Sequence, residues 1–142
     1  MTTKNQRVLL VDDYSDAREM YTEYLEFMGY EVLQAQNGVE ALERAIDSSP
    51  DIILMDLSLP IVDGWEATRR LKADKRTQSI PVVALTGHAL AGISEGAREA
   101  GCDAFVTKPC LPEDLVKEIR RILDEPASKK SRRSGKYAKN VN

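Results

Sequence analysis

Short apolar runs rich in branched residues alternate along this chain with longer segments in which apolar residues recur at every third or fourth position. The runs have the length and composition of buried strands, and the periodic segments are typical of helices that bury one face. The five predicted strands are RVLLV at 7–11, EVLQA at 31–35, DIILM at 51–55, PVVAL at 81–85 and AFV at 104–106. The predicted helices lie at 15–28, 38–48, 64–74 and 112–124, and a further one ends near residue 100.

Capping signals support the positions of three of these helices. Asn37 with Glu40, and Asp63 with Glu66, have the spacing of a capping box, in which a side chain at the helix start and a glutamate three residues later each accept a backbone N–H. Pro112 suits the first position of the last helix, where its missing N–H costs nothing.

Regular alternation of strand and helix with short connections predicts an α/β fold, in which a five-stranded parallel sheet carries helices on both faces. Ligands of such sheets bind at the carboxyl ends of the strands. The polar residues that follow the apolar runs are therefore the candidates for chemistry. They are Asp12 and Asp13 after the first run, Asp56 after the third, Thr86 after the fourth, and Thr107 and Lys108 after the fifth.

Three carboxylates at one edge of a sheet repel one another, so the sequence predicts a bound cation. A set of oxygen ligands without histidine or cysteine favours Mg²⁺, which is usually completed by water and phosphate oxygens. Lys108 and Thr86 add an ammonium and a hydroxyl that suit a phosphoryl group. This combination indicates phosphoryl transfer, in which an aspartate can itself be the nucleophile.

At these positions the sequence resembles the receiver domain of two-component response regulators. The resemblance is carried by VLLVDD, DIILMDLSLPIVDG, PVVALTGHA and AFVTKP, and it covers residues 6–124. It implies the flavodoxin-like sheet, with strand order 2-1-3-4-5, and a phosphorylation-dependent signalling switch rather than an enzyme. Because residues 125–142 are too few for an effector domain, we expect a stand-alone receiver of the cell-division (DivK) or chemotaxis type.

The resemblance also implies how the carboxylates divide their roles. Asp56 is expected to accept a phosphoryl group from a histidine kinase or a histidine phosphotransfer protein. Mg²⁺ is expected to bind at the acidic pair Asp12 and Asp13, at Asp56, and at the backbone carbonyl of Ser58.

Output is expected to depend on residues further along the chain. The family pattern implies that Lys108 and Thr86 contact the phosphoryl group and that Thr86 and Phe105 form a switch. The predicted partner surface consists of the fourth helix, the fifth strand and the fifth helix, within residues 88–122. The lone histidine, His88, is most simply a loop side chain near the site, where it and Ser58 can tune the lifetime of the phosphoryl group.

Charge divides the chain into two parts. Six of its 20 basic side chains lie in residues 126–142, which contain no acid, so residues 1–125 hold 14 basic and all 23 acidic side chains. We therefore expect a receiver domain at 1–125 and a basic, solvated tail at 126–142. The tail is the only hint of a nucleic-acid partner, and only its Tyr137 is able to stack on a base.

The remaining composition favours a cytoplasmic protein. No apolar run approaches the length of a membrane span, and the N-terminal apolar stretch is too short for a signal peptide. Cys102 and Cys110 have neither a metal-site nor a redox spacing, so we expect two reduced thiols.

Two other classes of protein share parts of this pattern. A haloacid-dehalogenase-like phosphatase also uses a strand-end aspartate with Mg²⁺, but it needs a second acid two residues later, where this chain has Ser58. A flavodoxin-type cofactor binder would cradle a phosphate in the loop after the first strand, and there the sequence DDYSD places three carboxylates. Both remain alternatives to the receiver.

Overall fold

Five parallel strands form one sheet, as the alternation of strands and helices predicts, and their order, β2-β1-β3-β4-β5, is the one that the resemblance to receiver domains implies. The computed structural model describes residues 6–57, 59, 62–87, 93–108 and 110–124. The strands are β1 (Arg7–Val11), β2 (Glu31–Ala35), β3 (Ile52–Asp56), β4 (Val82–Thr86) and β5 (Ala104–Thr107). The helices are α1 (Ser15–Phe27), α2 (Gly38–Ser48), α3 (Gly64–Ala73), α4 (Ile93–Ala100) and α5 (Pro112–Leu123).

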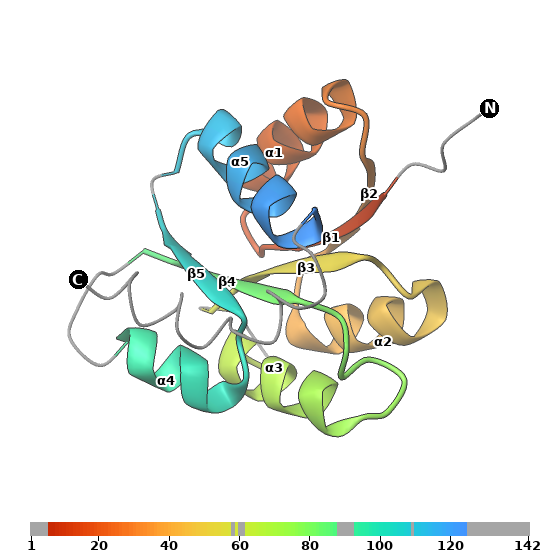
Figure 1. Ribbon diagram of the computed structural model, residues 1–142, viewed down its shortest axis with the longest axis vertical. Coiled ribbons are helices and arrows are strands. Elements are labelled where there is room, and N and C mark those ends of the chain that lie inside the picture. Colours follow the sequence, from red (N-terminus) through yellow and green to blue (C-terminus); the bar gives the residue numbers. More distant parts are fainter. Residues whose placement is uncertain (1–5, 58, 60–61, 88–92, 109, 125–142) are drawn as a thin grey trace.

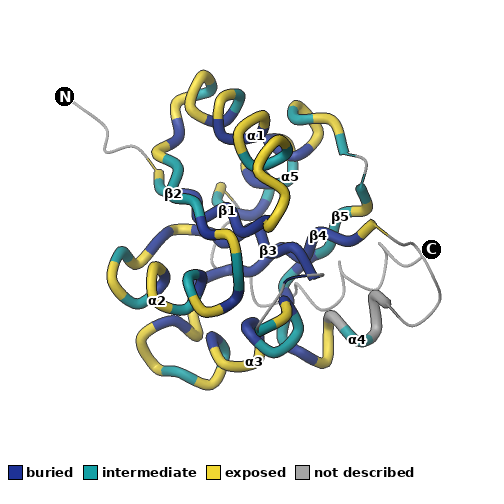
Figure 2. Tube along the Cα trace, turned by 180° about the vertical axis from the view of Figure 1, so that it is seen from behind, coloured by how far each residue is buried: buried dark blue, intermediate teal, exposed yellow. Residues whose placement is uncertain are grey.

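Helices cover both faces of the sheet, with α1 and α5 on one face and α2, α3 and α4 on the other (Figure 1). Two core clusters correspond to these faces because successive side chains of a strand point to opposite sides. Val8 and Leu10 of β1 belong to the cluster under α1 and α5, whereas Leu9 and Val11 belong to the cluster under α2 and α3. The central strands are buried along almost their whole length (Figure 2), which is why their sequences are apolar without alternation.

The N-terminal caps form as predicted, but the second half of each capping box does not. Asn37 Oδ1 accepts the N–H of Glu40 at 2.9 Å, and Asp63 Oδ1 accepts the N–H of Glu66 at 2.9 Å. The Glu40 carboxylate, however, accepts the N–H of Gln36, one residue before the cap, at 3.0 Å. Glu66 instead pairs with two arginines one turn further along α3. Glutamate side chains are long enough to find these partners, so the spacing predicts the cap and not the return bond.

Strand β3 extends one residue beyond its predicted end, to Asp56, and β4 one residue beyond its predicted end, to Thr86. The ladder continues past Asp56, since Leu57 N–H donates to the Leu85 carbonyl at 3.1 Å, and past Thr86, whose carbonyl accepts the Lys108 N–H at 2.7 Å. Asp56 and Thr86 are therefore held by regular backbone geometry, and they are only 8% and 5% exposed. The predicted boundaries were one residue early because periodicity places apolar side chains and not the last backbone hydrogen bond.

Both cysteines are free, as expected: Cys102 is buried, and Cys110 is partly buried. No helix in the described part of the chain is long and apolar enough to cross a membrane. The predicted tail, residues 126–142, lies outside the described residues.

Candidate functional site

The register of β1 and β3 brings the first and third candidate aspartates side by side. Val11 pairs with Met55 in the parallel ladder, so Asp12 and Asp56 are the next residues on adjacent strands. The two-residue alternation directs both toward the side of the sheet that α1 and α5 cover. Asp12 is fully buried, and Asp56 is 8% exposed. Two acids at the ends of buried strands thus become immediate neighbours.

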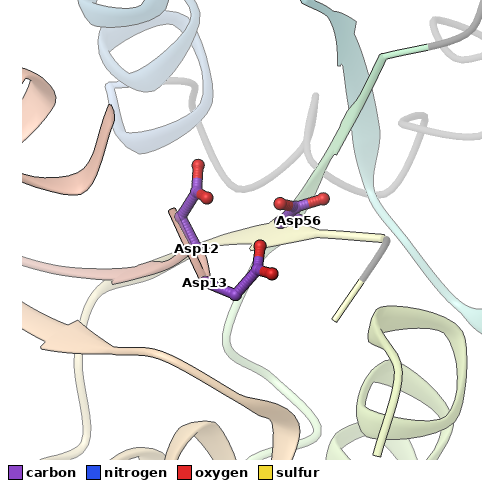
Figure 3. A group of neighbouring side chains, drawn as sticks. All are labelled: Asp12, Asp13 and Asp56. Carbon is purple, nitrogen blue, oxygen red and sulfur yellow. The ribbon is translucent and has the colours of Figure 1, made fainter. Parts of the chain in front are cut away.

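Asp13 completes a group of three carboxylates at this edge (Figure 3). One carboxylate oxygen from each of Asp12, Asp13 and Asp56 lies within 4.8 Å of the other two. Asp13 is exposed, so the group opens toward solvent on one side. Three convergent oxygen donors with an open side fit a small hard cation, since Mg²⁺ keeps several waters and shares phosphate oxygens. The donor set therefore matches the Mg²⁺ site expected from the sequence.

Asp12 is held by hydrogen bonds to β2 and to the first residues of α1 with its cap. Its N–H donates to the carbonyl of Ala35 at 3.0 Å, its carboxylate accepts the N–H of Tyr14 at 2.9 Å, and its carbonyl accepts Arg18 Nη1 at 2.8 Å. Arg18 also donates to Gln34 on β2 at 2.9 Å, which places α1 firmly over the strand end. These bonds fix the backbone from which the Asp12 carboxylate projects.

Lys108 supplies the positive charge of the site. Its Nζ lies 2.7 Å from Asp12 Oδ2 and 3.7 Å from Asp56 Oδ2. Burial lowers the pKa of Lys108, but the hydrogen bond to Asp12 and the nearby charge of Asp56 outweigh it and raise the pKa above its ordinary value. The ammonium is therefore charged throughout the physiological range and lies between two of the three carboxylates.

Thr86 and Phe105 lie on the other side of the sheet from Lys108. Thr86 is the last residue of β4, and its carbonyl accepts the Lys108 N–H at 2.7 Å. In the ladder Thr86 pairs with Thr107, and Ala84 pairs with Phe105, so Thr86 and Phe105 are diagonal neighbours on one face. Phe105 is partly buried and packs against the cluster under α2 and α3.

Gly64 is a site residue that the sequence reasoning missed, because Asp63-Gly64 indicated only a helix start. A Cβ at Gly64 would lie 2.2 Å from the Asp56 carbonyl oxygen and 2.6 Å from Leu57 Cα. Gly64 N–H also donates to the Leu57 carbonyl at 3.3 Å. The first turn of α3 therefore rests directly on the backbone of the candidate phosphoacceptor, an approach that only glycine allows.

The structure thus brings together Asp12, Asp13, Asp56 and Lys108, and it places Thr86 at the end of the adjacent strand. Two further candidates, Ser58 and His88, lie outside the described residues, so their roles stay predictions. A nucleophilic carboxylate beside a cation-binding acidic pair and a lysine is an arrangement suited to phosphoryl transfer.

Comparison with known proteins agrees with this chemistry. The sequence model of the response regulator receiver domain family matches residues 8–120 of this chain. The polar-differentiation response regulator DivK of Brucella anthropi is 37% identical over 118 residues, which are 83% of this chain and 96% of DivK.

Solved structures show the same fold. The receiver domain of the sensor histidine kinase PA1611 from Pseudomonas aeruginosa, solved with a magnesium ion coordinated in its active site cleft, has a TM-score of 0.80 at 32% identity and covers 86% of this chain and 100% of that domain. The chemotaxis protein CheY4 of Vibrio cholerae has a TM-score of 0.81 at 30% identity, over 84% of this chain and 100% of CheY4. This chain belongs to the response regulator receiver domain family, whose members are phosphorylation-dependent switches in two-component signalling.

Proposed function

We propose that Asp56 accepts a phosphoryl group from a histidine kinase or a histidine phosphotransfer protein, with Mg²⁺ held by Asp12, Asp13 and Asp56. The observation that carries this proposal is the convergence of these three carboxylates within 4.8 Å, with the Lys108 ammonium 3.7 Å from Asp56. The magnesium ion described in the Pseudomonas receiver domain supports the choice of cation. The backbone carbonyl of Ser58 is proposed as a further ligand on the family pattern alone.

Phosphoryl transfer to Asp56 needs little covalent chemistry from the protein. A carboxylate oxygen of Asp56 forms the new P–O bond while the P–N bond to the donor imidazole breaks, and the electron pair stays on that nitrogen. Lys108 moves the short distance from Asp12 toward the phosphoryl oxygens, and the Thr86 hydroxyl donates to another. When bound, Mg²⁺ neutralises the carboxylates and the transferred group together.

The product is a signal rather than the intermediate of a fast enzyme. Two residues after Asp56 the chain has Ser58, where phosphatases that use an aspartyl phosphate place a second acid. Without an acid there, the acyl phosphate at Asp56 lacks a group for rapid turnover. We accordingly propose slow self-dephosphorylation, with Ser58 and His88 tuning the lifetime.

Output is proposed to pass through Thr86 and Phe105. When the Thr86 hydroxyl turns toward the phosphoryl group, it vacates space at the end of β4. Phe105 lies diagonal to it on the same face and is already partly buried, so turning further inward is favourable by about 1 kcal/mol. The surface formed by α4, β5 and α5 then changes for a downstream protein partner.

The site of action is proposed to be the cytoplasm, where the two free cysteines stay reduced. Residues 126–142 are proposed to be a separate basic tail that takes no part in phosphoryl transfer, because its six cations and no acids contrast with the acidic remainder of the chain.

The test is phosphorylation by acetyl phosphate and Mg²⁺, followed as an intact-mass shift. The wild-type protein should gain one phosphoryl group, and Asp56→Asn should gain none. Asp51→Asn, a change of the same kind at the opposite edge of the sheet, should behave as the wild type does. Thr86→Ala should still be phosphorylated but should bind its downstream partner poorly. Labelling of Asp56→Asn at the wild-type rate would refute the assignment.

A further inference from the structure

Tyr21 links helix α1 to the connection between β5 and α5. Its side chain is 4% exposed, and its hydroxyl donates to the carbonyl of Cys110 at 2.7 Å. Cys110 lies two residues after Lys108 and directly before Leu111, the residue that caps α5. A single hydrogen bond thus joins positions 89 residues apart and reaches the connection that carries the lysine of the site.

Packing alone does not require this hydroxyl. The ring of Tyr21 lies in the cluster under α1 and α5, where a phenylalanine would fill the same space. Burying a hydroxyl is unfavourable unless it finds a partner, and here the partner is a backbone carbonyl. Burial, as the largest cause, raises the pKa of Tyr21, so the hydroxyl stays protonated and remains a donor.

The connection after β5 is held from two sides. On the sheet side, the Lys108 N–H donates to the Thr86 carbonyl at 2.7 Å. On the helix side, Tyr21 holds Cys110, while Leu111 offers no side-chain hydrogen bond to the first turn of α5. Between these two anchors, the Lys108 side chain is directed onto Asp12 and Asp56. Without the Tyr21 hydroxyl, backbone hydrogen bonds still hold the connection at Lys108 and at Leu111, whose carbonyl accepts the N–H groups of Asp114 and Leu115, but this bond to Cys110 is lost.

We propose that Tyr21 is a positioning residue for phosphoryl transfer, whose hydroxyl fixes the backbone at Cys110 and so keeps the Lys108 ammonium within reach of the group arriving on Asp56. This inference rests on the proposed roles of Asp56 and Lys108. Tyr21 acts through the lysine and not through the magnesium carboxylates. The rate of phosphorylation and the affinity for Mg²⁺ should therefore respond differently to its loss.

The test is Tyr21→Phe, which removes one oxygen and keeps the ring. We expect phosphorylation by acetyl phosphate at saturating Mg²⁺ to slow roughly three- to tenfold, as the loss of one hydrogen bond implies. The dissociation constant for Mg²⁺, measured by calorimetry, should not rise, because Lys108 competes with the cation for Asp12 and Asp56 rather than helping to bind it. Tyr24→Phe is the matched control, because it makes the same change on the same helix at a ring that packs against Phe27.

Without any phosphodonor, the Lys108 amide should exchange its hydrogen faster in Tyr21→Phe than in Tyr24→Phe.

A double-mutant cycle separates positioning from general support of the fold. In a Lys108→Ala background, Tyr21→Phe should cause no further slowing, since the group through which it acts is absent. A wild-type rate in Tyr21→Phe, or the same slowing in both backgrounds, would overturn the inference while Asp56-dependent labelling stands. Equal labelling of Asp56→Asn and the wild type would overturn the proposed function and this inference with it.

Discussion

At the scale of single residues, the site balances one ammonium against three carboxylates. Lys108 Nζ lies 2.7 Å from Asp12 and 3.7 Å from Asp56, so it competes with Mg²⁺ for the same oxygens. Lys108→Met removes this competing charge, so it should tighten Mg²⁺ binding by about 1 kcal/mol, or roughly fivefold. The same change should slow phosphorylation. Calorimetric titration measures the affinity. Lys117→Met, at an exposed lysine on α5, should leave it unchanged, and a weaker affinity in Lys108→Met would contradict this balance.

Another residue-scale prediction concerns pH. Burial raises the pKa of the Cys102 thiol to about 12. The folded protein then holds the thiol proton more tightly than the unfolded chain, so this group's contribution to stability is complete below pH 9 and is lost as the pH rises toward 12. The loss should approach about 1.4 kcal/mol per pH unit in that window. Urea unfolding at pH 8 and pH 11 should show a smaller decline in Cys102→Ala than in the wild type. Equal declines would refute the buried thiol as its cause.

At the scale of elements, the start of α3 is the most sensitive contact of the site. Gly64→Ala would place a methyl group 2.2 Å from the Asp56 carbonyl oxygen, so the helix or the strand must shift. We expect a loss of roughly 2–3 kcal/mol in unfolding free energy and impaired phosphorylation. Gly87→Ala is the control, because among the described residues no atom outside its chain neighbours lies within 4 Å of a Cβ there. Its unfolding free energy should change by about 0.5 kcal/mol or less. Similar losses in both variants would contradict the close approach.

Elements were predictable from the sequence because each apolar run is bounded by a cap or a turn. Asn37 and Asp63 accept N–H groups at helix starts, as their spacing predicts. The prediction that Glu40 and Glu66 accept the N–H of their cap residues was wrong. Glu40 accepts the N–H of Gln36 instead, and Glu66 pairs with arginines, which the spacing does not predict. The role of Gly64 was missed for a related reason, because the sequence shows that a helix starts there and not what it rests on.

At the scale of the whole molecule, topology explains why the site could be predicted and the contacts around it could not. In a parallel sheet all carboxyl ends meet at one edge, so residues that follow strands 1, 3 and 5 converge without any detailed geometry. The hydrogen bond from Tyr21 to Cys110 depends on how α1 packs beside the connection between β5 and α5. Local sequence patterns do not predict this packing.

At the molecular scale, the charge difference between residues 126–142 and the rest of the chain leads to a prediction about this tail. Deleting residues 126–142 removes six cations and should leave the phosphorylation rate and the unfolding midpoint unchanged. If the tail binds polyanions, the full chain should bind duplex DNA with an affinity that falls steeply with salt, with a log–log slope of about −5 for six contacts. The truncated chain should then not bind. Fluorescence anisotropy at several salt concentrations distinguishes these cases, and equal binding by both forms would exclude the tail as a polyanion site.

The most direct test of the central claim identifies the phosphorylated residue chemically. Borohydride reduces an aspartyl phosphate to homoserine, so treatment after phosphorylation marks the acceptor permanently for peptide mass spectrometry. The arrangement of Asp12, Asp13, Asp56 and Lys108 predicts homoserine at position 56 alone, and only when Mg²⁺ and a phosphodonor are both present. Homoserine at position 12 or 13, or a phosphoryl group on His88 with position 56 unmodified, would contradict the account.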